Sequence, residues 1–433
     1  RDLRPRVRRQ RQMCIRDRRS SEKNPFPIYV KVCCMNKEKI VLCDRKACTG
    51  CSACYATCPT GAVCMEADEE GFFIPRIDYD RCTGCQRCNA VCPVLRRNEP
   101  PADIRPLVLA AWHRDQVVRL ESSSGGVFSA LAETVLAQGG VVFGAAYDEH
   151  LRVHHIFIDS IGELSRLRGS KYVQSDLENS FREVRSFLRR KRMVLFVGTP
   201  CQITGLVHFI GAERCNHLIT CDFACHGVPS PLFFKEYLQW LAEHLHSKPE
   251  NFKFRDKSSG WYDALRFCYS QGHSFRITGK LDCYFHAFNR NLVLRNSCYQ
   301  CPTNGLERVS DITIGDFWGV GRQVDFPEAG EIKDGISLIL LHTERGSKLL
   351  QEAQNKLYIC ERSLDEALAG NAPLIHSSCR PQEREKIFRF LRENGFEKTR
   401  RYFLGKSLKE RIIAGIREYM PRKFVLFIRG RIP

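Results

Sequence analysis

Eight of the 23 cysteines form two copies of one spacing, and this pattern constrains the fold more than any other feature of the sequence. In each copy, three cysteines follow at intervals of three residues, and a fourth stands four residues later, directly before a proline. The two runs are Cys48, Cys51, Cys54, Cys58 and Cys82, Cys85, Cys88, Cys92. Such runs hold paired 4Fe-4S clusters, because thiolates are the ligands that these clusters require. The spacing therefore predicts two clusters.

The fourth cysteine of each run is expected to bind the cluster of the other run, as in two-cluster ferredoxins. The predicted ligand sets are Cys48, Cys51, Cys54 with Cys92, and Cys82, Cys85, Cys88 with Cys58. Two zinc sites of four thiolates are the alternative. Zinc sites, however, usually show two CxxC pairs separated by a longer insert, so the clusters are the preferred interpretation.

Residues 61–79, between the two runs, carry short apolar stretches on either side of the turn signal Asp68-Glu69-Glu70-Gly71. This pattern predicts a hairpin. A hairpin between two cysteine runs is typical of a small α+β ferredoxin-like module, which we place at residues 35–97.

The chain of 433 residues is several times longer than such a module, so a larger domain with its own core is expected. Residues 98–105 are expected to be a linker, residues 106–372 the larger domain, and residues 373–433 a basic helical C-terminal region. Within that last region, the apolar patch at 424–428 is too short to span a bilayer. Residues 1–34 are interpreted as a non-native or disordered leader, with Met35 as the expected start.

The formal net charge of +18 suggests a nucleic-acid partner until its distribution is considered. Residues 1–34 hold eleven Lys and Arg against three Asp and Glu, which is +8 of the total. The rest of the chain is only moderately basic, so no nucleic-acid role is expected, although a basic arm is the alternative for the leader. No signal peptide or transmembrane run is visible, and cluster assembly needs a reducing interior, so we expect a cytoplasmic protein of an anaerobe.

The larger domain alternates short apolar runs with helical stretches, which predicts α/β architecture. The expected strands are residues 107–112, 141–146, 194–198, 218–223, 311–317 and 337–342. The expected helices begin at residue 127 or span residues 177–188 and 232–245.

Four further cysteines lie in loops of this domain: Cys201, Cys225, Cys298 and Cys301. If these loops meet, the four thiols could hold a third 4Fe-4S cluster, since ligands need not be adjacent in sequence. A zinc ion, a redox thiol at the start of a helix, and plain core cysteines are the alternatives that spacing leaves open.

Several ordered motifs surround these cysteines: Ser123 to Gly126, residues 168–175, 198–202, 225–230, 254–257 with 260–261, 294–301 and 310–319. With them, residues 37–345 resemble the beta-subunit family of coenzyme F-420 hydrogenases and dehydrogenases. The resemblance implies non-covalently bound FAD beside a 4Fe-4S cluster held by Cys201, Cys225, Cys298 and Cys301. Cys221 precedes the family cysteine and is interpreted as a buried strand thiol, as are the leftover cysteines such as Cys43.

The residues that hold FAD are less clear from the sequence, because it contains neither a GxGxxG nor a GxxxxGK[ST] motif. Ser123, Ser124, Gly125 and Gly126 precede a predicted helix and offer free backbone N–H groups as a phosphate or flavin cradle. A simple helix cap and turn is the alternative. The further candidates are Ser170, Lys171 and Thr199. For Asp316 and His226, a role in the site stands beside a purely structural one, and no catalytic residue is assigned.

The expected fold is an α+β ferredoxin-like dicluster module followed by a larger α/β flavin-binding domain and a helical C-terminal tail. The expected function is that of an iron-sulfur flavoprotein oxidoreductase. It would exchange a hydride with a small-molecule carrier or substrate at FAD and pass single electrons through the clusters to a redox partner protein or ferredoxin. A non-catalytic ferredoxin-type adaptor subunit is the alternative, and the use of coenzyme F-420 itself stays open.

Overall fold

The computed structural model describes residues 40–96, 105–213, 216–322, 325–326 and 332–405. The expected leader, most of the expected linker and the apolar patch at 424–428 lie outside these residues. None of the described helices has both the length and the apolar character that crossing a membrane requires.

The first cysteine-rich segment folds around a hairpin of β1 (Val63–Ala67) and β2 (Phe73–Ile77). The carboxylate of Asp68 accepts hydrogen bonds from the backbone N–H groups of Glu70 and Phe72, and Gly71 adopts φ +83°, so the chain reverses tightly. The predicted hairpin is confirmed. Two short helices, α1 (Ala53–Thr57) and α2 (Arg87–Ala90), follow the first and second cysteine loops.

An eight-stranded sheet forms the centre of the larger part, in the order β13-β3-β12-β11-β7-β6-β4-β5. Its strands are β3 (Leu107–His113), β4 (Val141–Tyr147), β5 (Val153–Ile158), β6 (Val194–Val197), β7 (Leu218–Phe223), β11 (Ile312–Asp316), β12 (Ser337–Leu341) and β13 (Leu357–Glu361). The central strands β4, β6, β7 and β11 run parallel, and the outer pairs are antiparallel. Each of the six predicted strands is confirmed as a strand of this sheet.

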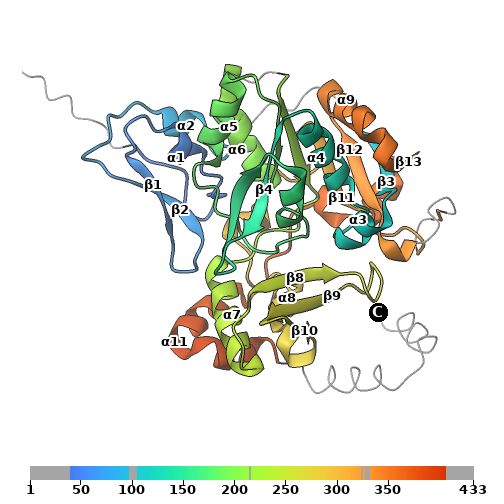
Figure 1. Ribbon diagram of the computed structural model, residues 1–433. Coiled ribbons are helices and arrows are strands. Elements are labelled where there is room, and N and C mark those ends of the chain that lie inside the picture. Colours follow the sequence, from blue (N-terminus) through green and yellow to red (C-terminus); the bar gives the residue numbers. More distant parts are fainter. Residues whose placement is uncertain (1–39, 97–104, 214–215, 323–324, 327–331, 406–433) are drawn as a thin grey trace, which may run out of the picture. The chain divides into compact units, whose positions relative to one another are not determined.

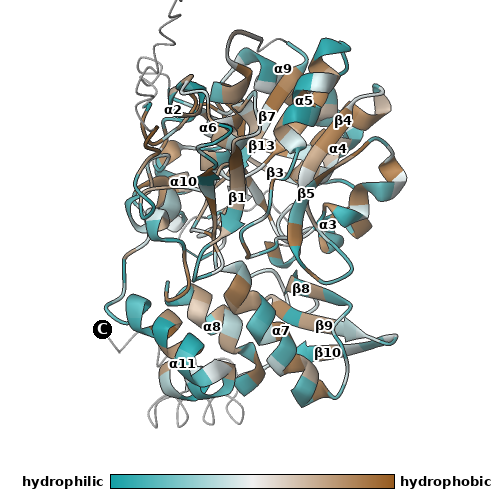
Figure 2. Ribbon diagram, turned by 90° about the vertical axis from the view of Figure 1, so that its left-hand side faces the viewer, coloured by the Kyte–Doolittle hydropathy of each residue, from teal (hydrophilic) through white to brown (hydrophobic). Residues whose placement is uncertain are grey.

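Helices cover both faces of the large sheet, as a sheet that is buried on both sides requires (Figure 1). On one face, α4 (Val127–Ala137) and α9 (Glu344–Ala353) pack on residues such as Val142 and Ile219. On the other face, α5 (Ser180–Arg189) and α6 (Pro200–Ile210) pack on Val141 and Phe143. Consecutive residues of β4 therefore serve opposite cores. Figure 2 shows α4 as mostly hydrophobic, which fits a helix buried on nearly all sides.

The predicted helix at 177–188 begins three residues later than expected. Asp176 accepts a hydrogen bond from the backbone N–H of Glu178, and Glu178 adopts φ +43°. This local turn competes with the helix, which therefore starts at Ser180. Shorter helical elements complete this part: α3 (Gln116–Glu121) after β3, α10 (Leu364–Gly370) after β13, and η4 (Asn296–Gln300).

A second core lies below the large sheet in Figure 1 and was not anticipated from the sequence. It contains the antiparallel strands β8 (Asn251–Asp256), β9 (Leu265–Ser270) and β10 (His273–Ile277), with α7 (Pro231–Leu245), α8 (Cys283–Asn289) and α11 (Arg384–Phe403). Ile387, Phe388 and Leu391 of α11 are buried against α7. This described part of the predicted C-terminal region is thus packed into the larger part of the protein.

Candidate functional site: cysteine clusters beside a large cavity

The first cluster site comprises the thiols of Cys48, Cys51, Cys54 and Cys92. Burial, as the main cause, and the neighbouring thiols of Cys48 and Cys92 together raise the pKa of Cys51 to about 12. Burial also raises the pKa of Cys54, again with Cys51, Cys48 and Cys92 as neighbours. The structure thus brings Cys92 of the second run to the three cysteines of the first, in the crossed arrangement that the spacing predicts.

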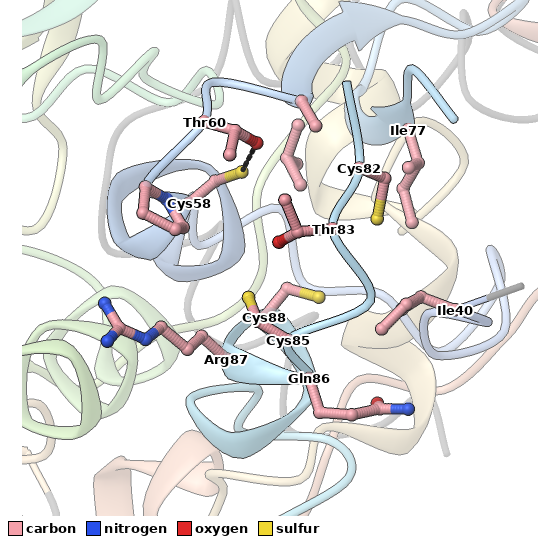
Figure 3. Close-up of a pocket in the computed structure, with 13 residues that line it drawn as sticks. Ile40, Cys58, Thr60, Ile77, Cys82, Thr83, Cys85, Gln86, Arg87 and Cys88 are labelled. Atoms are coloured by element: carbon pink, nitrogen blue, oxygen red, sulfur yellow. Dashed lines mark hydrogen bonds between the residues drawn. The ribbon is translucent and has the colours of Figure 1, made fainter. Parts of the chain in front are cut away.

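The second cluster site comprises Cys58, Cys82, Cys85 and Cys88, which line one small cavity together with Ile40 and Ile77 (Figure 3). Cys58 reaches this cavity from the end of α1, and the other three come from the loop before α2 and from α2 itself. Burial raises the pKa of Cys88, and hydrogen bonds from Thr60 and nearby backbone N–H groups outweigh burial at Cys58 and lower its pKa. Cys58 is therefore placed with the second run.

Cys43 is a fifth thiol at the first cluster site, and sequence spacing gave no reason to expect it there. Its hydrogen bonds to Cys48 and Cys92 lower the pKa of each of those thiols to about 6. In the described part of the chain, no three His, Cys, Asp or Glu side chains converge as the ligands of a single metal ion. The cysteines of a 4Fe-4S cluster each bind a different iron, so their sulfurs do not meet at one point.

The candidate third cluster site, called the third cluster site below, consists of the thiols predicted to hold a third cluster: Cys201, Cys225, Cys298 and Cys301. The structure brings them together from three separate loops. Cys201 stands in the first turn of α6, Cys225 follows β7, and Cys298 and Cys301 lie in and after η4. Burial raises the pKa of Cys225 well above its usual value, and the thiols of Cys298, Cys201 and Cys301 raise it further. Cys221 is a fully buried thiol on β7. Burial raises its pKa, and the nearby carboxylates of Asp222 and Asp311 add to the rise.

The first and third cluster sites are neighbours. The thiol of Cys201 contributes to the raised pKa of Cys51, after burial as the main cause. Gly205 of α6 packs directly on Cys51, since a Cβ atom at Gly205 would lie 2.8 Å from the Cys51 Sγ atom. Helix α6 therefore carries Cys201 at its start and supports the first cysteine loop one turn later.

A cavity of about 620 Å³ opens beside the third cluster site, and Cys225 is one of its lining residues. Of the residues predicted to hold FAD, six line it: Ser123, Ser124, Gly126, Ser170, Lys171 and Thr199. Gly125 does not. Its backbone N–H donates to the Ser337 hydroxyl, and a Cβ atom there would lie 2.4 Å from the Ala111 carbonyl oxygen. Gly125 thus serves the close packing of this loop on the sheet.

Hydrogen bonds between the loops fix the shape of this cavity. The Ser123 hydroxyl accepts from the backbone N–H of Ser170 at 2.7 Å, and the Ser124 hydroxyl donates to the Ile336 carbonyl at 2.8 Å. Gly126 is the N-cap of α4 and adopts φ +95°, and no side chain caps this helix. The backbone N–H groups at the start of α4 consequently face a region lined by small polar residues.

The ammonium group of Lys171 donates hydrogen bonds to the backbone carbonyls of Arg166, Leu167 and Arg168, at 3.1, 3.3 and 2.9 Å. All three of its N–H bonds are thereby engaged. Burial lowers its pKa to about 7. Lys171 therefore holds the loop at residues 166–168 in place, and its ammonium group lies at the wall of the cavity.

An aromatic wall, which was missed as a functional element from the sequence, closes another side of the same cavity: Trp261, Tyr262, Trp318, Phe285 and Phe288. The rings of Trp261 and Trp318 stack at 4.9 Å between centroids. Asp316 accepts hydrogen bonds from Arg255 and from the indole of Trp261, at 3.2 and 2.5 Å. Asp316 thus positions the wall. The only signal in the sequence was that Trp261 and Trp318 lie in motifs of the resemblance, whereas Tyr262, Phe285 and Phe288 do not.

His226 lies beside Cys225 and packs its ring on Phe288, with 5.0 Å between ring centroids. One ring nitrogen lies 2.6 Å from the Asn291 side-chain oxygen. Burial lowers its pKa. These contacts fit the purely structural role, one of the two considered for this residue from the sequence.

Family models match both the cysteine-rich segment and the larger part of the chain. Residues 108–182 match the model of the N-terminal part of the coenzyme F420 hydrogenase/dehydrogenase beta subunit, and residues 191–367 match the model of its C-terminal part. Residues 47–95 and 74–129 match two models of 4Fe-4S dicluster domains. No curated protein matches the chain.

Among solved structures, a chain of the xenon-derivatised F420-reducing [NiFe] hydrogenase complex from Methanosarcina barkeri is similar, with 15% sequence identity and a TM-score of 0.43. The match covers 66% of this chain and 99% of that one. From the family models, the chain belongs to the coenzyme F420 hydrogenase/dehydrogenase beta-subunit family, as an iron-sulfur protein of the electron-transferring oxidoreductase type.

Proposed function

We propose that the protein is an iron-sulfur flavoprotein oxidoreductase, with FAD in the large cavity and a 4Fe-4S cluster at the third cluster site. One observation carries this proposal: Cys225 belongs to the four converged thiols and also lines the cavity. A group bound in the cavity would therefore lie next to a group bound by the thiols.

The cavity fits a flavin nucleotide in size and in the character of its walls. Its volume of about 620 Å³ falls in the range of ordinary cofactor pockets. Ser123, Ser170 and the first N–H groups of α4 would hold the phosphates, because a helix start attracts anions. The aromatic wall would cover the apolar ring system. The buried side chain of Arg255 forms an ion pair with Asp316 at this wall, at 3.2 Å.

The third cluster site fits a cluster by the chemistry of its donors. Burial raises the pKa of Cys201 to about 11 and that of Cys298 to about 12, so these thiols ionise only when a cation takes the place of the proton. The Thr199 hydroxyl lies 3.2 Å from the Cys201 sulfur, and the Val228 N–H lies 3.5 Å from the Cys298 sulfur. Such hydrogen bonds to sulfur adjust the potential of a cluster.

The proposed groups would form a series. The cavity adjoins the third cluster site at Cys225, Cys201 adjoins Cys51 of the first cluster site, and the two cysteine runs interleave through Cys92 and Cys58. When bound, FAD would supply the exchange of a hydride against single electrons, and the clusters would carry those electrons one at a time. Cys85 is exposed, so a redox partner protein would approach the second cluster site.

Cys225→Ala tests the proposal, with Cys221→Ala as the matched control four residues earlier in the chain. After anaerobic purification, we expect Cys225→Ala to lose about four of about twelve irons, which is one cluster. Cys221→Ala should keep the iron content of the unchanged protein, because its thiol is a buried strand residue. Full iron in Cys225→Ala, or equal losses in both variants, would contradict the third cluster.

A further inference from the structure

Arg295 is a buried cation between two of the cluster sites. Its side chain leaves the segment just before η4, and the residue is only 3% exposed. Its backbone N–H donates to the Val228 carbonyl at 3.0 Å, and the preceding Leu294 forms a β-bridge with Pro229. The residue is therefore anchored beside the segment that follows Cys225.

The guanidinium group of Arg295 lies against the first cysteine loop. Its Nε donates to the Cys48 carbonyl at 2.7 Å, and one terminal nitrogen donates to the Gln174 side-chain oxygen at 3.2 Å. A Cβ atom at Gly50 would lie 2.8 Å from that terminal nitrogen. Glycine at this position thus lets the loop of the first cluster site approach the guanidinium group closely.

Arg295 has no carboxylate to balance its charge: among the described residues, none forms an ion pair with it. Arg308, which is also buried, by contrast lies 3.5 Å from Asp222. A buried charge without a counter-charge is costly, so its partner is expected nearby. Cys48, whose carbonyl Arg295 binds, would supply such a negative charge as a cluster thiolate.

Arg295 contacts ligand residues of both neighbouring sites. Its guanidinium group binds the Cys48 carbonyl of the first cluster site. Its own backbone carbonyl accepts a hydrogen bond from the backbone N–H of Cys298, of the third cluster site, at 3.0 Å. Arg295 therefore lies between these two sites.

We propose that Arg295 is the shared counter-cation of the first and third cluster sites and holds the reduction potentials of both clusters up. Each one-electron reduction adds one negative charge to a cluster and moves no proton, and a nearby cation in a dry interior favours that charge. The same guanidinium group favours an electron on either side of it. This role rests on the third cluster of the proposed function.

The test compares three variants of the full chain, purified anaerobically with clusters in place. Arg295→Gln removes the charge but keeps hydrogen-bonding atoms, and Arg295→Lys keeps the charge. Arg182→Gln is the matched control, since Arg182 also donates to backbone carbonyls of the cysteine-rich segment, those of Ala56 and Tyr55. Iron analysis first establishes cluster content, and a redox titration followed by EPR then gives the potential of each cluster.

We expect Arg295→Gln to move two of three potentials to more negative values and to leave the third, that of the second cluster site, in place. Arg295→Lys should restore most of the shift, and Arg182→Gln should change none of the potentials. Unchanged potentials in a fully iron-loaded Arg295→Gln would overturn the proposal. So would loss of iron from both Arg295 variants, since the residue would then act through its hydrogen bonds. If the unchanged protein holds only about eight irons, the third cluster fails instead.

Discussion

At the residue scale, the buried Lys171 makes both the stability of the protein and its affinity for FAD depend on pH. Burial lowers its pKa from the usual 10.5 to about 7. Because this folded value lies below the unfolded one, the cofactor-free protein gains stability as pH rises from about 7 towards 10.5. Two titratable neighbours stay neutral in that window. Burial lowers the pKa of His155 to about 4 and raises that of Tyr147.

A phosphate group near Lys171 reverses this preference, since an anion favours the protonated lysine. The affinity for FAD should therefore be highest near pH 7 and fall as pH rises, by up to about tenfold per pH unit. Titration of the flavin-free protein with FAD at several pH values measures this slope. Lys171→Met should flatten it, whereas Lys356→Met, which removes a lysine paired with Glu133, should leave it unchanged. The same slope in Lys171→Met would show that the lysine is not near the phosphates.

At the residue scale, the sequence predicts ligands well and their surroundings poorly. The two cysteine runs specify eight thiols, because that chemistry needs fixed local spacing. The positions of Cys43 and Arg295 at the cluster sites could not be predicted from such spacing. Arg295 stands 247 residues from Cys48, whose carbonyl it binds, and only the folded chain brings the two together.

At the scale of elements, α11 is tied to the hairpin between the two cysteine runs. Arg384 at the start of α11 is fully buried, and its two terminal nitrogens lie 2.6 Å from the carboxylate oxygens of Glu70 in the turn. The same guanidinium donates to the Leu294 carbonyl at 2.8 Å. The pair therefore joins the hairpin, α11 and the segment that leads to Arg295.

Glu70→Gln should destabilise the protein strongly, because it leaves the buried Arg384 without its counter-charge. We expect a loss of about 3–5 kcal/mol in the free energy of unfolding, measured by urea denaturation. Glu385→Gln is the control. It breaks the ion pair between Glu385 and Arg380, whose side chains are 69% and 39% exposed, respectively. The loss in the free energy of unfolding should be less than about 1 kcal/mol. Equally small effects of both substitutions would contradict a stabilising role of the ion pair between Glu70 and Arg384.

The strands of the large sheet were predictable because they are continuous apolar runs, and β7 matches residues 218–223 in full. The sheet of β8, β9 and β10 was not predictable from the sequence. Its strands mix apolar with charged residues, as Lys253 and Arg255 do in β8, and their core is completed by α11, more than a hundred residues later. Apolar patterning alone does not reveal such a partner.

At the scale of the whole molecule, the described residues from Ile40 onward belong to one compact unit. Four arginines from the larger part contact the cysteine-rich segment: Arg182, Arg295, Arg384 and Arg392. The sequence predicted both parts. It did not predict how they dock, since each contact pairs residues more than a hundred positions apart.

The central claim is that the protein binds FAD and a third 4Fe-4S cluster in addition to the two clusters of the cysteine runs. The most direct test measures iron, sulfide, zinc and flavin in one sample. The full chain, purified anaerobically, should contain about twelve irons with matching sulfide and one FAD, and no stoichiometric zinc. About eight irons without flavin, or zinc in place of the last four irons, would contradict it.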